Sequence, residues 1–323
     1  MRAVKSAYFR IVVNEIGDRG VWPVGQMPPA GWRATPFAGT VEACADQVAE
    51  LGARQQPGDG PAPVSRATDE TLVRALRAVA RRQPDAPALR LGTRSLTYRQ
   101  LWDAVDSPAG DRAGPVGDLL TALVDGAAQP VPELLVMSGD LPVRWRHRTL
   151  LRLAGECGLP RLGPGSRLLQ SSPAGHPLFP VEVLRALLTG AELVLAPAGV
   201  PCDAQALTVL AGGPGLTRFA AGPDVLLGCP ETTMLCAVTV PGTASCAPLP
   251  GGHLYVFDER FRPAEAGELY VGGEPIAAGY LDRPDLTLSR FLPDPLSSRH
   301  GRLMFRTGLR VRRLPAGRIE MAA

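Results

Sequence analysis

The sequence predicts an α/β (α+β) protein in which a small antiparallel sheet with one helix precedes a larger layered region. Two short β-prone runs meet at a glycine turn over residues 8–24. Apolar residues then recur at helical spacing over 41–51 and again over 69–83. Further on, residues 181–197 read as a helix, a glycine turn and a buried strand, which is the unit of an α/β layer.

The first of these segments predicts a compact unit over residues 8–57. The runs "YFRIVV" and "RGVWPV" are expected to be strands, and Gly17 in the intervening "NEIGD" takes the tight position of the turn. The following "GQMPPAGWRATPFAG" is expected to be a loop. After it, Thr40 is placed to cap a helix with one apolar face, and Gly52 is placed to end it.

A linker is expected between this unit and a second region. The stretch 53–66 is rich in proline, glycine and glutamine and lacks apolar periodicity, which predicts a linker that we place at 58–67. The second region then opens with a helix capped by Thr68. Two hairpins and a short apolar helix are predicted inside it, over 88–98, 253–273 and 117–126. The expected division of the chain is 1–57, 58–67 and 68–323.

Composition excludes several classes of function. The net charge of +3 over 323 residues is too small to indicate a nucleic-acid groove. The six cysteines include no C-x-x-C pair and the four histidines add no zinc spacing, so no metal site is predicted. The most apolar window is too short and too polar to cross a bilayer. A soluble, cytoplasmic protein without nucleic-acid or membrane partners is expected.

The first unit resembles an MbtH-like protein, the small activator that binds adenylation domains of nonribosomal peptide synthetases. The match consists of N-E-x-G, V-W-P, P-x-G-W, a glycine and a cysteine, in the family's order and spacing. The resemblance implies a cleft between two tryptophans that receives a small apolar residue of the adenylation domain. The expected partner-binding residues are Asn14, Trp22, Pro23, Gly31 and Trp32.

This chain departs from the MbtH-like motif at three positions, and the two tryptophans allow an alternative interpretation. The chain has Asp18, Arg19 and Gly20 where the family usually has glutamine, an aromatic residue or histidine, and serine. Two tryptophans in so small a unit could also simply form its core. The partner-contacting interpretation is preferred, because aromatic anchors are common at protein interfaces.

The second region resembles the N-terminal subdomain of an amino-acid adenylation domain. The match is carried by "SRLLQSSPAGHPLFPVEVLRALLTGAELVLAP", "GCPETT", a long run beginning "LYVFDERFRP", and "FRTG". It covers most of residues 69–320, with large gaps. The resemblance implies the fold of an adenylate-forming enzyme, in a truncated form that lacks the family's C-terminal subdomain.

Adenylation joins a carboxylate to ATP and releases pyrophosphate, so it needs hydrogen-bond donors and cations around the phosphates. The stretch aligned with the family's phosphate loop is "VMSGDLPVRWRHR". Asp140 adds a negative charge there, Pro142 removes a donor and Trp145 adds bulk, which predicts a broken loop. The three arginines of this stretch could hold an anion, but a solvated strand or helix start is the favoured alternative.

At the other site positions implied by the resemblance, this chain retains some of the family's residues and replaces others. Glu231, followed by Thr232, stands where the family's magnesium-binding glutamate stands, although a capped helix start explains Glu231 equally well. Arg306 lies within the kept "FRTG", but Leu309 replaces the aspartate that accepts both ribose hydroxyls. Pro177 replaces the aspartate that pairs with the substrate amine.

The favoured hypothesis is therefore a non-catalytic accessory of nonribosomal peptide and antibiotic biosynthesis. In it, the MbtH-like unit activates an adenylation domain of a synthetase and carries a pseudo-adenylation scaffold, with no catalytic residue and no cofactor. Glu231, Thr232 and Arg306 are then vestigial nucleotide contacts. Lys5 is the only lysine, so none follows that could serve as the family's catalytic cation.

Two alternatives stay open. One is an amino-acid adenylating ligase that uses ATP and magnesium and is completed in trans by a C-terminal subdomain. The other is a decayed remnant whose second region does not fold stably, because shortened strand segments leave an incomplete core.

Overall fold

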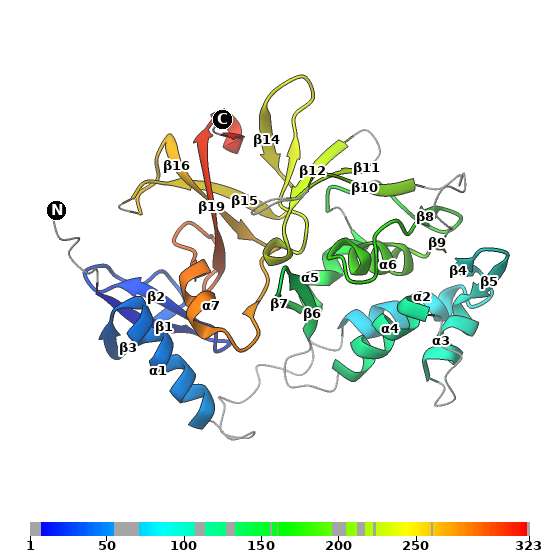
Figure 1. The fold of residues 1–323 in the computed structure, drawn as a ribbon, viewed down its shortest axis with the longest axis horizontal. Coiled ribbons are helices and arrows are strands. Elements are labelled where there is room, and N and C mark those ends of the chain that lie inside the picture. Colours follow the sequence, from blue (N-terminus) through cyan, green and yellow to red (C-terminus); the bar gives the residue numbers. More distant parts are fainter. Residues whose placement is uncertain are drawn as a thin grey trace.

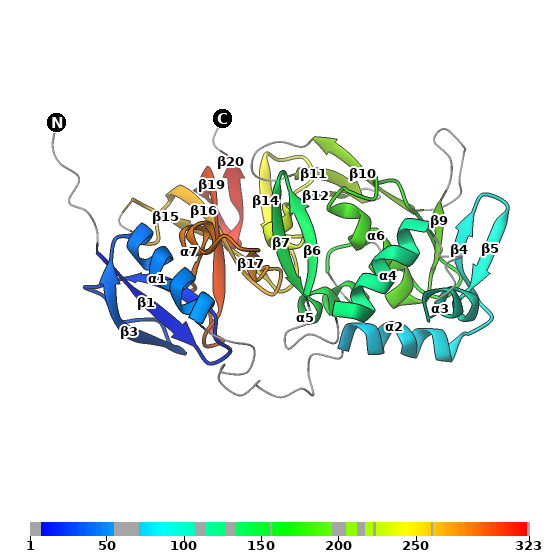
Figure 2. The same ribbon diagram turned by 60° about the horizontal axis from the view of Figure 1, so that its bottom comes forward.

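The computed structural model describes residues 8–54, 71–106, 114–126, 133–155, 157–159, 161–195, 205–211, 217–221, 224–259 and 261–321. Figures 1 and 2 show these residues in two views. The expected linker 58–67, the predicted cap Thr68 and Lys5 lie outside these ranges.

The N-terminal unit is an antiparallel sheet in the order β2-β1-β3, covered by one helix. Its elements are β1 (Phe9–Asn14), β2 (Arg19–Pro23), β3 (Trp32–Gly39) and α1 (Val41–Arg54). The predicted hairpin is confirmed, and Gly17 has the positive φ of 83° that the turn requires. The hydroxyl of Thr40 accepts the Ala43 amide proton at 3.2 Å, as expected of the helix cap.

Two expectations for this unit are wrong. The predicted loop before the helix contains the strand β3, half of whose residues are exposed, so no apolar alternation marked it in the sequence. The helix also runs on past Gly52 to Arg54. A single glycine costs a helix only about 1 kcal/mol, which neighbouring turns can offset.

The second region begins with helices packed beside a mixed sheet. Its first elements are α2 (Thr71–Arg82), β4 (Pro87–Leu91), β5 (Arg94–Thr97), α3 (Tyr98–Asp106), α4 (Gly114–Gly126), β8 (Arg167–Leu169), α6 (Leu178–Thr189) and β9 (Glu192–Leu195). Strands β8, β9 and β4 are parallel, and β5 closes the predicted hairpin at the edge. The predicted helix–turn–strand unit is confirmed, with Gly190 left-handed between α6 and β9.

Strand β10 also lies parallel to β8, and from β10 the sheet continues into antiparallel strands. The full order is β15-β16-β19-β20-β14-β13-β12-β11-β10-β8-β9-β4-β5 (Figure 1). The further elements are β10 (Gln205–Ala211), β11 (Thr217–Ala221), β12 (Asp224–Gly228), η2 (Pro230–Thr232), β13 (Ala237–Thr239), β14 (Ser245–Pro248), β15 (Gly252–Phe257), β16 (Ala266–Gly273), α7 (Pro284–Arg290), β18 (Phe291–Pro293), β19 (Leu303–Arg313), η3 (Pro315–Gly317) and β20 (Ile319–Met321). The hairpin predicted over 253–273 is formed by β15 and β16.

A second, smaller sheet has the order β17-β7-β6. It consists of β6 (Glu133–Ser138), β7 (Leu141–Arg146) and β17 (Gly279–Tyr280), and the chain leaves β7 through α5 (His147–Leu150) and η1 (Leu151–Ala154). This small sheet is important for the site, because it contacts both the turn that follows β12 and the N-terminal unit.

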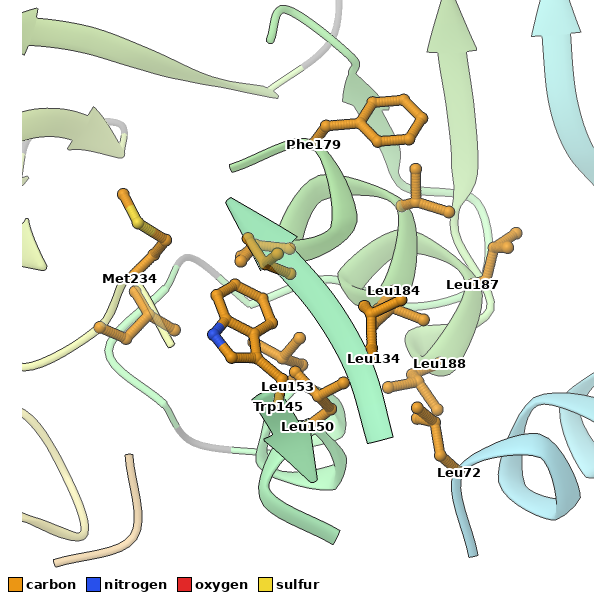
Figure 3. Packing of buried hydrophobic residues seen from close by; sticks show 14 of the residues in the cluster. Leu72, Leu134, Trp145, Leu150, Leu153, Phe179, Leu184, Leu187, Leu188 and Met234 are labelled. Atoms are coloured by element: carbon orange, nitrogen blue, oxygen red, sulfur yellow. The ribbon is translucent and has the colours of Figure 1, made fainter. Parts of the chain in front are cut away.

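The main core lies between α6, the small sheet and the surrounding helices. Figure 3 shows Trp145 among leucines of several elements, including Leu150, Leu153 and Leu184. The Trp145 side chain is fully buried, and burying a large apolar side chain contributes about 1.5–3 kcal/mol. The same buried cluster contains Val12, Trp22 and Trp32 of the N-terminal unit. The two regions therefore share one core.

A second shared cluster lies where α1 packs against α7, as both ribbon views show. Leu288 of α7 is buried there among Ile11, Val21 and Cys44 of the N-terminal unit. No described helix is long and apolar enough to cross a membrane. The observed mixture of small antiparallel sheet, helix and larger α/β region confirms the predicted fold class.

Candidate functional site

The turn after β12 is built around the sequence G-C-P-E-T-T. The Thr232 hydroxyl accepts the Cys229 amide proton at 3.1 Å, and the short helix η2 places Glu231 at its centre. Two residues that are not glycine, Thr233 and Met234, have positive φ values of 46° and 63°. Such strain persists only where the surroundings over-determine the backbone, and it is concentrated at functional sites.

The Glu231 side chain is buried and held on one oxygen by two hydroxyl groups. Its Oε1 accepts hydrogen bonds from the Ser138 hydroxyl at 3.0 Å and from the Tyr280 phenol at 2.9 Å. Burial, and then the charge of Glu231, raise the pKa of Tyr280 well above its ordinary value. The phenol therefore stays protonated and acts as a donor, which fixes the direction of the carboxylate.

The stretch predicted to be a broken phosphate loop is a tight hairpin. Ser138 ends β6, Leu141 begins β7, and Gly139 turns the chain with a φ of 59°. The bulk expected of Trp145 does not reach this turn, because Trp145 lies in the core and its indole N–H donates to the Pro230 carbonyl at 2.6 Å. Trp145 thus joins the buried core to the Glu231 turn through this hydrogen bond.

The arginines of this hairpin are engaged with carboxylates. Arg144 pairs with Glu133 at 2.8 Å on the neighbouring strand. Arg146 pairs with Asp18 of the N-terminal unit, and both side chains are largely buried. The alternative of a solvated strand therefore describes Arg144 only in part, and it does not describe Arg146.

The motif "FRTG" is held by Glu268 of the neighbouring strand β16. The Arg306 guanidinium donates to both Glu268 oxygens at 2.8 Å, and the Gly308 amide donates to the same carboxylate at 3.1 Å. Leu309 is half-buried and packs against an apolar cluster that includes Val311 and Leu227. Glu231 and Thr232 share one turn, whereas Arg306 is held elsewhere, by Glu268.

The position predicted to anchor a substrate amine has no charge. Pro177 precedes α6 and has helical backbone angles. Two carboxylates of that motif, Glu182 and Glu192, are buried. Glu182 accepts hydrogen bonds from the Ser171 hydroxyl at 2.8 Å and the Ser172 amide at 3.2 Å. Burial raises the pKa of Glu182, and these donors oppose the shift. Its contacts are those of a group that ties α6 to the end of β8.

The residues predicted to bind a partner face this chain's own second region. The Asn14 amide donates to the Gly301 carbonyl at 2.8 Å, and a Cβ on Gly31 would lie 2.5 Å from the Gly301 nitrogen. Trp22 is 5% exposed and meets the Phe261 ring edge-on at 5.8 Å. Trp32 is 6% exposed, and Pro23 is half-buried at the end of β2.

A cavity of about 370 Å³ lies beside this junction. Side chains of both regions line it, among them Glu15, Asp18, Arg146, Arg148 and Glu274. No three His, Cys, Asp or Glu side chains converge on a metal-sized site anywhere in the part of the chain that the structure describes. Glu231 is thus not part of such a cluster.

The chain is similar in sequence to peptide synthetases. No family model matches the chain. It is 37% identical over 136 residues to a linear gramicidin synthase from Brevibacillus parabrevis, covering 37% of this chain and 2% of the relative. It is 35% identical over 176 residues to novobiocin biosynthesis protein H from Streptomyces niveus, covering 50% of this chain and 29% of the relative. The chain thus spans well under two thirds of either relative's length.

Structural comparison gives the fold. The N-terminal subdomain of NpsA from Klebsiella oxytoca superposes with a TM-score of 0.56 at 18% identity, covering 77% of this chain and 99% of that one. The same subdomain in complex with 3-hydroxybenzoyl-AMSN also has a TM-score of 0.56, at 17% identity, and covers 80% and 99%. The predicted fold of an adenylate-forming N-terminal subdomain is confirmed.

These comparisons correct the functional hypothesis. The relatives are synthetases and biosynthetic proteins, and the solved structures with the same fold include an adenylation-domain protein of a nonribosomal peptide synthetase and its N-terminal subdomain. The prediction of a non-catalytic accessory is wrong, and the alternative of an amino-acid adenylating ligase is favoured. Sequence reasoning gave the missing positions too much weight, and it had no signal for the two hydroxyl groups that hold Glu231.

Proposed function

We propose that the chain carries the nucleotide- and substrate-binding part of an amino-acid adenylating ligase. The reaction joins an amino-acid carboxylate to ATP, forms an aminoacyl adenylate and releases pyrophosphate. The observation that carries the proposal is the buried Glu231 carboxylate, held by Ser138 and Tyr280 in a strained turn. The fold and the synthetase relatives supply the reaction class.

Magnesium fits the Glu231 turn. In nucleotide sites Mg²⁺ is usually bound by one or two carboxylates and completed by substrate phosphates and water. A lone glutamate is sufficient in that arrangement, and bound Mg²⁺ would neutralise phosphate charge during the reaction. The chain's own part is orientation, because Ser138 and Tyr280 hold one oxygen of Glu231 and the Ala277 amide donates to the Glu231 carbonyl at 2.9 Å.

The ribose end fits the nucleotide less well. Leu309 accepts no hydrogen bond from a ribose hydroxyl, and its side chain packs against apolar residues. The carboxylate that contacts this segment, Glu268 of β16, is already engaged by Arg306 and by the Gly308 amide. We therefore expect the enzyme to bind nucleotide mainly through its phosphates and magnesium.

The N-terminal unit is assigned as an MbtH-like module that docks on the adenylation region of its own chain. The assignment rests on the match of Asn14, Trp22 and Gly31 to the family's motif, together with the contacts these residues make to Gly301 and Phe261. The proposed division remains 1–57, 58–67 and 68–323. In this proposal the N-terminal unit completes the enzyme of its own chain and is not an accessory of another protein.

Isothermal titration of the purified chain with ATP, with and without Mg²⁺, tests the proposed function. Wild-type protein is expected to bind Mg·ATP, and Glu231→Gln to weaken that binding by about 100-fold through loss of the metal's anionic ligand. Glu320→Gln is the matched control, because Glu320 forms a partly exposed ion pair with Arg312 between β20 and β19, and its change is expected to leave binding intact. ATP–pyrophosphate exchange with single amino acids then identifies the substrate. The proposal is refuted by wild-type protein that binds no Mg·ATP.

A further inference from the structure

The small sheet β17-β7-β6 connects the N-terminal unit to Glu231. Its strand β7 pairs with β6 on one side and with β17 on the other. The tip of the β6–β7 hairpin supplies Ser138, and β17 supplies Tyr280, so both groups that hold the Glu231 carboxylate belong to this sheet. Anything that shifts the sheet therefore shifts the carboxylate.

A first connection to the N-terminal unit runs through an ion pair at the base of the hairpin. Arg146 ends β7, and its guanidinium donates to both oxygens of Asp18 in the β1–β2 turn, at 3.2 Å for the Nη1 contact. The two side chains are only 13% and 12% exposed. Arg146 also faces Glu133 at 3.9 Å, across the hairpin. A buried charge pair of this kind holds its elements in register, because losing one partner leaves the other charge uncompensated.

A second connection runs through α7. Helix α1 of the N-terminal unit packs against α7, where Leu288 is buried among N-terminal residues. On the same helix, the Thr287 hydroxyl accepts the Tyr280 amide proton at 3.0 Å. A Cβ on Gly279 would lie 2.6 Å from the Thr287 methyl group, so β17 and α7 are in close contact. The position of Tyr280 thus depends on a helix that the N-terminal unit covers.

We infer that the N-terminal unit positions the metal-binding carboxylate of its own chain, and that Asp18 is a positioning residue acting through Arg146 and the β6–β7 hairpin. This inference rests on the proposed role of Glu231 in holding Mg·ATP. Undocking the unit releases the base of the hairpin and α7 together, and Glu231 then loses the fixed direction given by Ser138 and Tyr280. The N-terminal unit in this way sets the affinity of the site for the magnesium complex of the nucleotide.

Hydrogen exchange of the full chain tests the inference without any activity. In Asp18→Asn the carboxylate loses its charge but keeps its shape, and amides of 133–146 are expected to exchange about tenfold faster, in the range of typical couplings between sites. Amides of the β15–β16 hairpin serve as the internal reference for folding. Asp106→Asn is the matched control, because it breaks another ion pair between elements, with Arg77 at 3.0 Å, away from the N-terminal unit.

Titration with nucleotide supplies the second readout. Asp18→Asn is expected to weaken Mg·ATP binding about tenfold and to leave ATP binding in the presence of a chelator unchanged. Asp18→Glu, which retains the negative charge, is expected to restore most of the magnesium-dependent affinity.

The two ideas fail separately. Unchanged exchange of 133–146 in Asp18→Asn overturns the coupling, whatever the activity. Equal losses with and without magnesium would mean that Asp18 is merely structural, and they also overturn it. Wild-type protein that binds no Mg·ATP refutes the proposed function instead, while the exchange experiment still decides whether the N-terminal unit holds the hairpin.

Discussion

The two segments that match the adenylation motifs closely are built in different ways. The Glu231 turn is strained and buried, and its carboxylate is directed by hydroxyl groups from two other strands. The Leu309 segment lies within strand β19, where a partly exposed ion pair joins Arg306 to Glu268 and Leu309 covers an apolar cluster. The chain therefore constrains its backbone and side chains around Glu231, the proposed metal ligand, more tightly than around Leu309, where the proposed ribose end has only structural contacts.

The largest expected difference between the two segments is in stability, and one glycine in each segment tests it. A Cβ on Gly228 would lie 1.7 Å from the Met234 carbonyl oxygen, which belongs to the rigid backbone of the Glu231 turn. Gly228→Ala is therefore expected to cost about 3 kcal/mol of unfolding free energy, as overpacking in a tight core does. Gly308→Ala meets only the end of the flexible Arg290 side chain at 3.4 Å, and its φ of 80° implies a cost of about 1 kcal/mol.

Urea denaturation of both variants measures the difference. Gly175→Ala is the control, since its Cβ meets nothing within 4 Å. If Gly308→Ala destabilises the chain as much as Gly228→Ala does, the backbone around Glu231 is not more tightly constrained than the backbone around Leu309. A single cooperative transition in the wild-type protein, seen by more than one probe, would also exclude the decayed remnant whose second region does not fold.

The next prediction concerns the ribose end. Leu309→Asp restores an acceptor for ribose hydroxyls, and a hydrogen bond to a charged group contributes about 1.5–3 kcal/mol, so AMP affinity is expected to rise at least about tenfold. Stability is expected to fall by about 1–2 kcal/mol, because the apolar cluster loses the Leu309 side chain.

Isothermal titration with AMP and thermal unfolding of the same samples check both halves of this prediction. Leu309→Asn, which is isosteric with the aspartate but neutral, should show the loss of stability with a smaller gain in affinity. Unchanged AMP affinity in Leu309→Asp would mean that no ribose approaches Leu309. The Glu231 and Leu309 segments would then differ only in how they stabilise the fold, and not in how they bind a nucleotide.

Much of the fold could be predicted from the sequence, because the signals were local. Gly17 and Gly190 marked turns that the structure confirms, and Thr40 marked a helix start. The strand β3 was missed, because it is an edge strand of a three-stranded sheet and half of its residues are exposed. Its pairing with β1 therefore comes from tertiary contacts.

The site was less predictable, for a physical reason. Glu231 was found from its motif, but Ser138 and Tyr280 lie 93 and 49 residues away along the chain, and no local pattern connects them. Trp145 was interpreted as an obstacle in the phosphate loop, yet it is buried beneath Pro230. The pairing of Asp18 with Arg146 spans 128 residues and involves a position where the chain departs from the family's motif. Side-chain direction at these places is set by packing, which the sequence does not display.

The smallest effect is expected for the phenol at the Glu231 turn. Tyr280→Phe removes one of two donors to Glu231, so Mg·ATP binding is expected to weaken about fivefold, which is about 1 kcal/mol.

The same change also alters how stability depends on pH. The folded pKa of Tyr280 lies above its ordinary value of 10.0, so its contribution to stability is fully present below pH 10 and is lost as pH rises through the folded pKa. The difference in stability between wild type and Tyr280→Phe should therefore be constant up to about pH 10 and change above it. Tyr255→Phe is the matched control, because that phenol also donates to a carboxylate, Asp294 at 3.2 Å, but belongs to β15. Equal losses of Mg·ATP affinity in the two variants would contradict a special role of Tyr280, since only one of the phenols touches Glu231.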